Sequence, residues 1–126
     1  MPFLLAVMML ATTSPSVLTA HLILPPVSTV TVQKEAWLDA LAECENRDHV
    51  KKILDRNNRF SYADYMFQMS TWLEQGKKFG ATRENIASSS LQRIVARDML
   101  NRGMWKRWYH CSLKIHKKLG LYPVGE

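Results

Sequence analysis

The chain has 126 residues, of which 47% are hydrophobic and 22% charged, and its formal net charge is +6. This length holds one domain, or a smaller domain with an arm, and the apolar content excludes disorder over most of the chain. The charge is sorted by position. Residues 1–33 contain no Lys, Arg, Asp or Glu, residues 34–90 carry nine basic and nine acidic side chains, and residues 91–126 carry eight basic and two acidic ones. This sorting predicts a polypeptide that meets two unlike surroundings.

An uncharged apolar segment opens the sequence, with apolar runs at Met1–Leu10 and Val17–Leu24. A secretory signal, a transmembrane helix and an arm lying on a partner or a bilayer interface are the three interpretations. The segment lacks the basic start of a secretory signal and the roughly 20 consecutive apolar residues of a membrane span. We therefore expect an uncharged apolar arm over residues 1–33, with Val27–Val32 extended because apolar and polar residues alternate there. The alternative, in which the arm folds back over the protein's own helices, stays open.

Three helices are predicted in the middle of the chain. The first covers Gln33–Glu45, because its apolar residues fall on one helical face. A short second helix begins at the cap Asp48 and ends at Asn57, and a third begins at Ser61 and ends at Gly80. The carboxylate pairs of the first helix, Asp39 with Glu43 and Glu43 with Glu45, are interpreted as a solvated surface face.

One long cationic helix is predicted over about residues 82–119, with Thr82 as its cap, a kink at Gly103 and an end at Gly120. Trp105, Trp108, Ser112, Ile115 and Leu119 follow helical spacing, and this face is expected to pack on the earlier helices. The predicted contacts with anionic lipid or RNA are Arg102, Lys106, Arg107, Lys114, Lys117 and Lys118, and the predicted interfacial aromatic residues are Trp105, Trp108 and Tyr109.

Cysteine and histidine spacings exclude the common reactive and metal-binding motifs. Cys44 and Cys111 lie 67 residues apart in predicted helices and form no CxxC pair, so we expect buried free thiols, with a single bridge between two helices as the alternative. His110 and His116 are six residues apart, which does not place them on one metal-facing side of a helix. No catalytic, cofactor or metal residues are predicted.

The predicted fold is all-α: a small bundle of three or four helices over residues 34–126, preceded by the arm. We expect a non-catalytic accessory or structural subunit of a large mitochondrial inner-membrane complex, of the respiratory chain or ATP synthase. Its expected partners are other protein subunits and anionic lipid, and it is not expected to be a stable free monomer. The alternative is a small mitochondrial ribosomal protein that binds rRNA through its basic C-terminal helix. An adaptor that binds calmodulin or another partner is the third interpretation.

Overall fold

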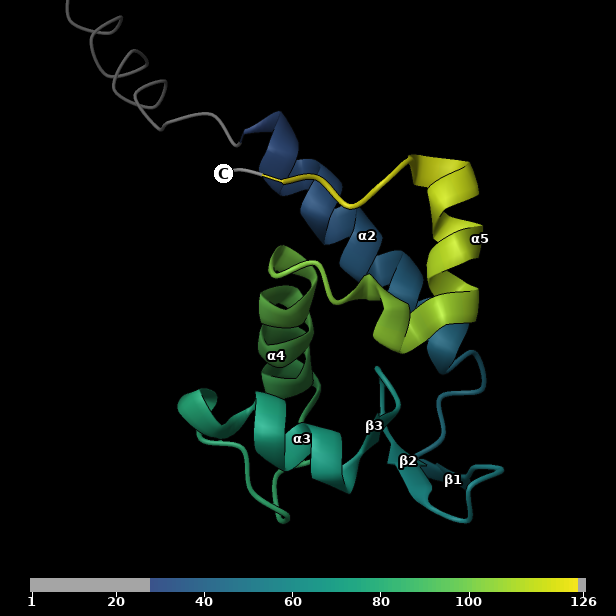
Figure 1. The fold of residues 1–126 in the computed structure, drawn as a ribbon, viewed down its shortest axis with the longest axis vertical. Coiled ribbons are helices and arrows are strands. Elements are labelled where there is room, and N and C mark those ends of the chain that lie inside the picture. Colours follow the sequence, from purple (N-terminus) through teal and green to yellow (C-terminus); the bar gives the residue numbers. More distant parts are fainter. Residues whose placement is uncertain (1–27, 125–126) are drawn as a thin grey trace, which may run out of the picture.

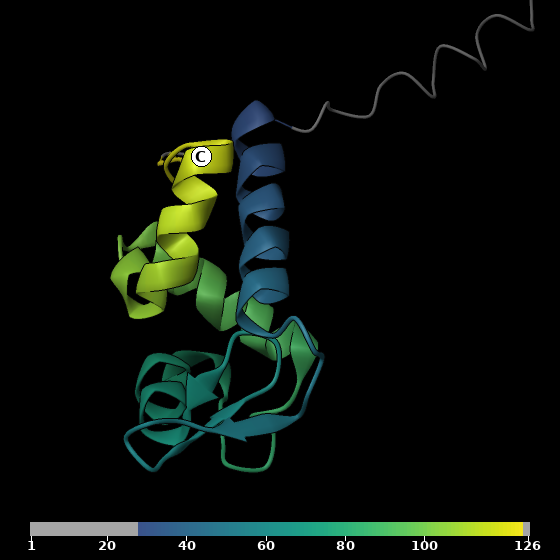
Figure 2. The same ribbon diagram turned by 90° about the vertical axis from the view of Figure 1, so that its right-hand side faces the viewer.

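The fold combines four α-helices with a small antiparallel sheet, and the computed structural model describes residues 28–124. Helices α2, α4 and α5 form one side of the molecule, and α3 lies beside the sheet on the other side (Figures 1 and 2). The helices are α2 (Thr29–Glu45), α3 (Met69–Gln75), α4 (Ser89–Asn101) and α5 (Tyr109–Leu119), and two 3-10 helices are η1 (Lys77–Phe79) and η2 (Trp105–Trp108).

The sheet contradicts the all-α prediction. Its strands β1 (Lys52–Leu54), β2 (Phe60–Tyr62) and β3 (Phe67–Gln68) pair antiparallel in the order β1-β2-β3. Between β1 and β2 the chain reverses at Asn58, whose φ of 65° is left-handed and suits asparagine. Ile53 and Leu54, which fall within the predicted second helix, are half exposed on β1. The predicted second helix is therefore wrong.

The first predicted helix is confirmed, but α2 begins earlier, at Thr29. The Ser28 hydroxyl accepts a hydrogen bond of 3.0 Å from the backbone N–H of Thr31 and so caps the helix. The prediction of an extended segment is wrong for residues 29–32. Residues 1–27 of the arm predicted over residues 1–33, with the membrane span considered for residues 1–24, lie outside the described residues.

The predicted third helix is wrong over its first half, because Ser61 lies in β2 and helical structure begins only at Met69. Gly76 ends α3 at a crowded position, where an added Cβ would lie 2.5 Å from the Ala81 Cβ. Gly80, where this helix was predicted to end, instead closes the separate 3-10 helix η1, with a φ of 83° in the left-handed region.

The prediction of a single long C-terminal helix is also wrong. Ser88, not Thr82, caps α4. This helix ends at Asn101, and the chain then changes direction at Gly103, whose φ is 79°. The short helix η2 then redirects the chain into α5, which packs against α2 and ends at Gly120. A kink was expected at this glycine, but its left-handed backbone permits a complete change of direction.

The core is dominated by tryptophans whose indole N–H groups join distant segments. Trp37 donates to the Gly120 carbonyl over 3.0 Å, Trp72 donates to the Thr82 carbonyl over 2.8 Å, and Trp108 donates to the Tyr65 carbonyl over 2.8 Å. All three side chains are almost fully buried, so these bonds satisfy the polar atom that each ring carries into the core.

Cys44 and Cys111 form a disulfide that joins the end of α2 to the start of α5, with their Cα atoms 5.8 Å apart. The expectation of free thiols is wrong. Both cysteines were expected in helices, but only the packing of α2 on α5 brings the two sulfurs together.

Candidate active site

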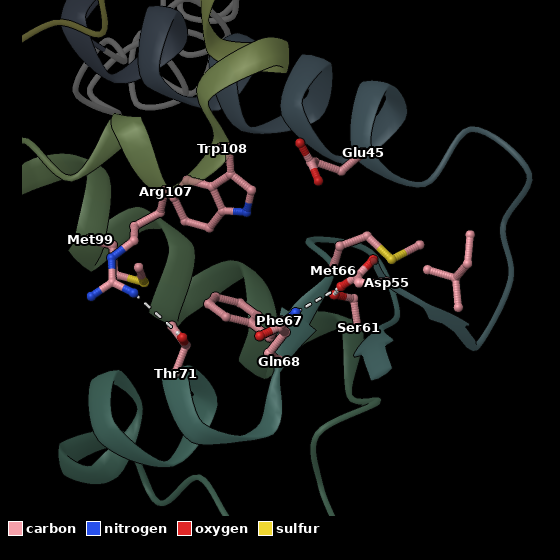
Figure 3. Close-up of a pocket in the computed structure, with 11 residues that line it drawn as sticks. Glu45, Asp55, Ser61, Met66, Phe67, Gln68, Thr71, Met99, Arg107 and Trp108 are labelled. Carbon is pink, nitrogen blue, oxygen red and sulfur yellow. Dashed lines mark hydrogen bonds between the residues drawn. The ribbon is translucent and has the colours of Figure 1, made fainter. Parts of the chain in front are cut away.

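A half-open groove of about 470 Å³ lies between the helices and the sheet. Glu45, the last residue of α2, faces it from the helical side (Figure 3). Asp55 from the end of β1 and Ser61 from β2 face it from the sheet. The remaining lining residues are Ile53, Met66, Phe67, Gln68, Thr71, Met99, Arg107 and Trp108. Two carboxyl groups from different parts of the fold thus share one solvent-accessible space.

Glu45 is the unusual ionisable group of this groove. Burial, with a smaller contribution from the negative charge of Asp55, raises the pKa of its carboxyl from 4.5 to about 7. No hydrogen bond from another described residue reaches this carboxyl group to stabilise its charged form. Glu45 therefore keeps its proton to near-neutral pH, which a carboxylic acid needs if it is to act as a proton donor.

The disulfide fixes the backbone beside this acid, because Cys44 directly precedes Glu45. Hydrogen bonds also fix the residue that follows α2. The Asn46 side-chain amide donates to the Val50 carbonyl over 2.8 Å, and the Asn46 side-chain oxygen accepts from the Val50 N–H over 2.9 Å. Asn46 is buried, so these two bonds hold the chain where it leaves the helix. The position of Glu45 is thereby set from both neighbouring residues.

Asp55 is held by hydrogen bonds that suit an ionised carboxylate. The Ser61 hydroxyl and the Gln68 amide both donate to its Oδ2 atom, the latter over 2.9 Å. Within the described part of the chain, no hydrogen bond reaches the other oxygen, Oδ1. This oxygen is therefore free to accept a hydrogen bond from water or a ligand. The Gln68 amide is itself oriented by Asn57, whose Oδ1 accepts from it over 3.1 Å.

The far wall of the groove supplies a cation and an aromatic ring. Trp108 is buried and fixed by its bond to Tyr65, and it presents part of its ring to the groove. Arg107 is exposed, and its guanidinium lies 3.5 Å from the Thr71 hydroxyl (Figure 3). The groove therefore has a carboxylic proton donor on one side and, on the opposite side, a cation that binds an anionic substituent of a ligand.

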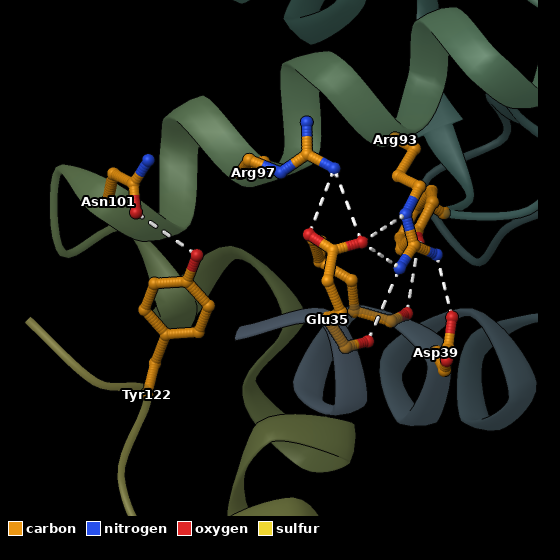
Figure 4. A network of polar contacts seen from close by, with 8 residues as sticks. Glu35, Asp39, Arg93, Arg97, Asn101 and Tyr122 are labelled. Atoms are coloured by element: carbon orange, nitrogen blue, oxygen red, sulfur yellow. Dashed lines mark hydrogen bonds and ion pairs between the residues drawn. The ribbon is translucent and has the colours of Figure 1, made fainter. Parts of the chain in front are cut away.

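Two of the basic residues behind the cationic character of the C-terminal segment are neutralised internally. Arg93 reaches Glu35 over 2.6 Å and Asp39 over 2.8 Å, and Arg97 reaches Glu35 over 3.1 Å (Figure 4). These bonds raise the pKa of Arg93 despite its burial, and the bond from Arg93 is the main cause of a lowered pKa at Glu35. The acidic face of α2 that was interpreted as solvated thus binds α4.

The six predicted contacts with an anionic partner are all exposed. Arg102 is also paired, at 2.8 Å from Asp98, and it donates to Gln75 over 2.7 Å. Arg107 lines the groove. Lys106 lies over the Trp105 ring, 5.6 Å from its centre. The other three, Lys114, Lys117 and Lys118, lie on α5.

The aromatic residues predicted for an interface lie in three different environments. Trp108 is in the core, Trp105 is partly buried beside His116, and Tyr109 is half exposed. Packing of the Trp108, Ser112 and Ile115 face on the protein's own helices is confirmed, because all three are buried.

Sequence reasoning missed the groove residues Glu45, Asp55, Ser61 and Gln68. A usable signal was the polar run Asp55–Asn58 between two short apolar stretches, which is typical of a hairpin turn. Reading it as a hairpin would have placed Asp55 at the end of a strand. No sequence signal identifies Glu45, because its raised pKa depends on burial by residues distant in the chain.

Comparisons of the chain with protein-family models, with curated proteins and with solved structures gave no match. Residues 28–124 contain no helix with the length and apolar character needed to cross a membrane. Over the same range, no group of three or more His, Cys, Asp or Glu side chains is placed to hold a metal ion. The function is therefore argued from the groove alone.

Proposed function

We propose that the protein is a glycoside-cleaving enzyme, with Glu45 as the general acid and Asp55 as the second carboxylate. The observation that carries the proposal is the pair of unlike carboxyl groups facing one groove, one buried without a hydrogen-bond donor and one held by two donors. Enzymes that cleave glycosidic bonds use such a pair, in which environment alone keeps one group protonated and the other ionised.

The proposed mechanism follows from the two environments. Glu45 donates its proton to the glycosidic oxygen, so that the leaving sugar departs as a neutral alcohol. Asp55 accepts a proton from a water molecule at its free Oδ1 atom, and the activated water attacks the anomeric carbon. Ser61 and Gln68 hold the Asp55 carboxylate in position through Oδ2 while this happens. Both transfers are made by residues of this chain and require no cofactor.

The proposed substrate is an anionic polysaccharide. A groove open to solvent accepts part of a long chain. Arg107 is placed to bind a carboxylate substituent, and the net charge of +6 attracts a polyanion. Bacterial peptidoglycan, which carries carboxylates along an amino-sugar backbone, fits these features better than neutral chitin.

The test is the release of soluble sugar fragments and new reducing ends from purified peptidoglycan and from chitin. We expect cleavage of peptidoglycan, and a loss of at least about 100-fold in Glu45→Gln, since a general acid contributes roughly 10² to 10⁴ in rate. Glu43→Gln is the matched control, because Glu43 is exposed on the same helix. Full activity in Glu45→Gln, or no release from either polymer by the wild type, would overturn the proposal.

The sequence-based expectation of a non-catalytic accessory subunit of a mitochondrial inner-membrane complex stays a prediction, as does the ribosomal alternative. The first rested on the uncharged first 33 residues, and both rested on an unneutralised cationic C-terminal segment. The ion pairs of Arg93, Arg97 and Arg102 weaken the second of these supports. The glycoside-cleaving proposal is favoured because it explains the groove, which the accessory role does not use.

A further inference from the structure

Helix α5 has one face in the core and one face in solvent. Cys111, Ser112 and Ile115 are buried against the rest of the molecule. The exposed face consists of two adjacent rows at helical spacing. One row holds Tyr109, Leu113 and Lys117, and the other holds His110, Lys114 and Lys118. Tyr109 is 50% and Leu113 38% exposed, so large apolar side chains stand among the lysines on the outer surface.

Within residues 28–124, the lysines of this face form no ion pair. The ion pairs formed between residues 28 and 124 use Lys78, Arg93, Arg97 and Arg102 as their cations, and none uses Lys114, Lys117 or Lys118. Three like charges within one turn of helix repel one another unless an anion lies nearby. The exposed face of α5 is thus one place where excess positive charge of the chain remains available.

Further exposed apolar side chains lie at the end of α5. Leu119 is 50% and Leu121 72% exposed. The start of α2 lies at the same end of the molecule, because Trp37 bonds to Gly120 and the Lys34 ammonium lies 5.8 Å from the centre of the Tyr122 ring. The segment that follows α5 therefore runs along the first half of α2 (Figure 1).

We propose that the exposed face of α5 docks on the surface of an anionic bilayer. Tyrosine and leucine side chains enter the interfacial layer, while lysines reach the lipid headgroups, and this combination defines an interfacial helix. Exposed leucines bury no apolar area against the phosphates of a nucleic acid or against a charged polysaccharide, whereas they do bury apolar area in a bilayer. This docking is independent of the proposed reaction, and it holds the groove close to the membrane surface because Arg107 and Trp108 directly precede α5.

The test is co-sedimentation of the full chain with vesicles of phosphatidylcholine alone or mixed with phosphatidylglycerol. Neutralising Lys114, Lys117 and Lys118 together to Gln should weaken binding to the anionic vesicles by about 100-fold, at about fivefold for each lysine. The matched control removes the same number of charges from the exposed residues Lys51, Arg56 and Arg59, near the sheet. This control and Glu45→Gln should bind like the wild type.

A second variant separates bilayer docking from simple attraction to any polyanion. Tyr109→Ser combined with Leu113→Ser keeps every charge, and we expect it to weaken vesicle binding about tenfold or more through loss of buried apolar area. Unchanged vesicle binding in this variant would point to a soluble polyanion and overturn the proposal. Equal binding to both kinds of vesicle, equal binding of the triple Gln variant, or no binding by the wild type would overturn it as well.

Discussion

Glu45→Gln should stabilise the protein at alkaline pH, although it removes a residue of the proposed active site. In the wild type, the pKa of Glu45 rises from an ordinary value of 4.5 in the unfolded chain to about 7 in the folded protein. Between these two values the folded state binds the proton and the unfolded state does not. The free energy of unfolding therefore falls as the pH rises from about 4.5 to 7, and the amide variant lacks this loss.

The size of the effect follows from the two pKa values. At 1.36 kcal/mol for each pKa unit, the difference corresponds to about 3 kcal/mol, which is an upper bound because the carboxyl group keeps some contact with solvent. Below pH 4.5, Glu45 is neutral in both states, and the variant and the wild type should have similar stability. Above pH 7, the variant should be the more stable by up to about 3 kcal/mol. A domain of this size would then unfold up to about 10 °C higher.

The assay is urea unfolding of both proteins at pH 4, 6 and 8, followed by tryptophan fluorescence, with Glu43→Gln as the control on the same helix. The free energy difference between Glu45→Gln and wild type should grow with pH, while the control should show no such trend. A difference that stays constant across this range would refute the reasoning, because it would mean that Glu45 ionises in the folded protein as it does in the unfolded chain.

Three further predictions concern the framework around the groove. Cys111→Ser opens a disulfide between residues 67 positions apart and should lower the free energy of unfolding by about 4 kcal/mol; a urea midpoint equal to that of the wild type would contradict this. Gln92→Leu leaves the Tyr65 N–H without its acceptor in the core and should destabilise by about 2–3 kcal/mol in the same assay, whereas a neutral effect would show that the N–H finds another partner. Gly76→Ala places a Cβ 2.5 Å from that of Ala81 and should lower the melting temperature by several degrees, an effect that a calorimetric scan showing no change would exclude.

Helical periodicity identified the elements whose stability is largely local. The first helix and the inward face of the last one were predicted because their apolar residues recur every three or four positions and do pack inward. The sheet was missed because its strands have only two or three residues, and β1 exposes every side chain, so no alternation marks it. The break at Gly103 was underestimated because the sequence does not show that α5 turns back to pack on α2.

The candidate site was missed because it exists only in the folded chain. Glu45 looked like a surface carboxylate beside Glu43, and its different environment comes from the sheet and η2, which enclose the end of α2. Asp55 gains its role through Ser61 and Gln68, which lie on two other strands. The disulfide likewise depends on two helices that are distant in sequence. Composition did locate the excess positive charge, but ion pairing by Arg93 and Arg97 decides how much of it remains available.

The pH dependence of peptidoglycan cleavage tests the central claim most directly, because it joins the proposed reaction to the protonation of Glu45. The rate at low substrate concentration should fall about tenfold for each pH unit above about 7, as the acid loses its proton. A rate that stays constant from pH 6 to pH 9, or the absence of cleavage throughout that range, would contradict the assignment of Glu45 as the proton donor.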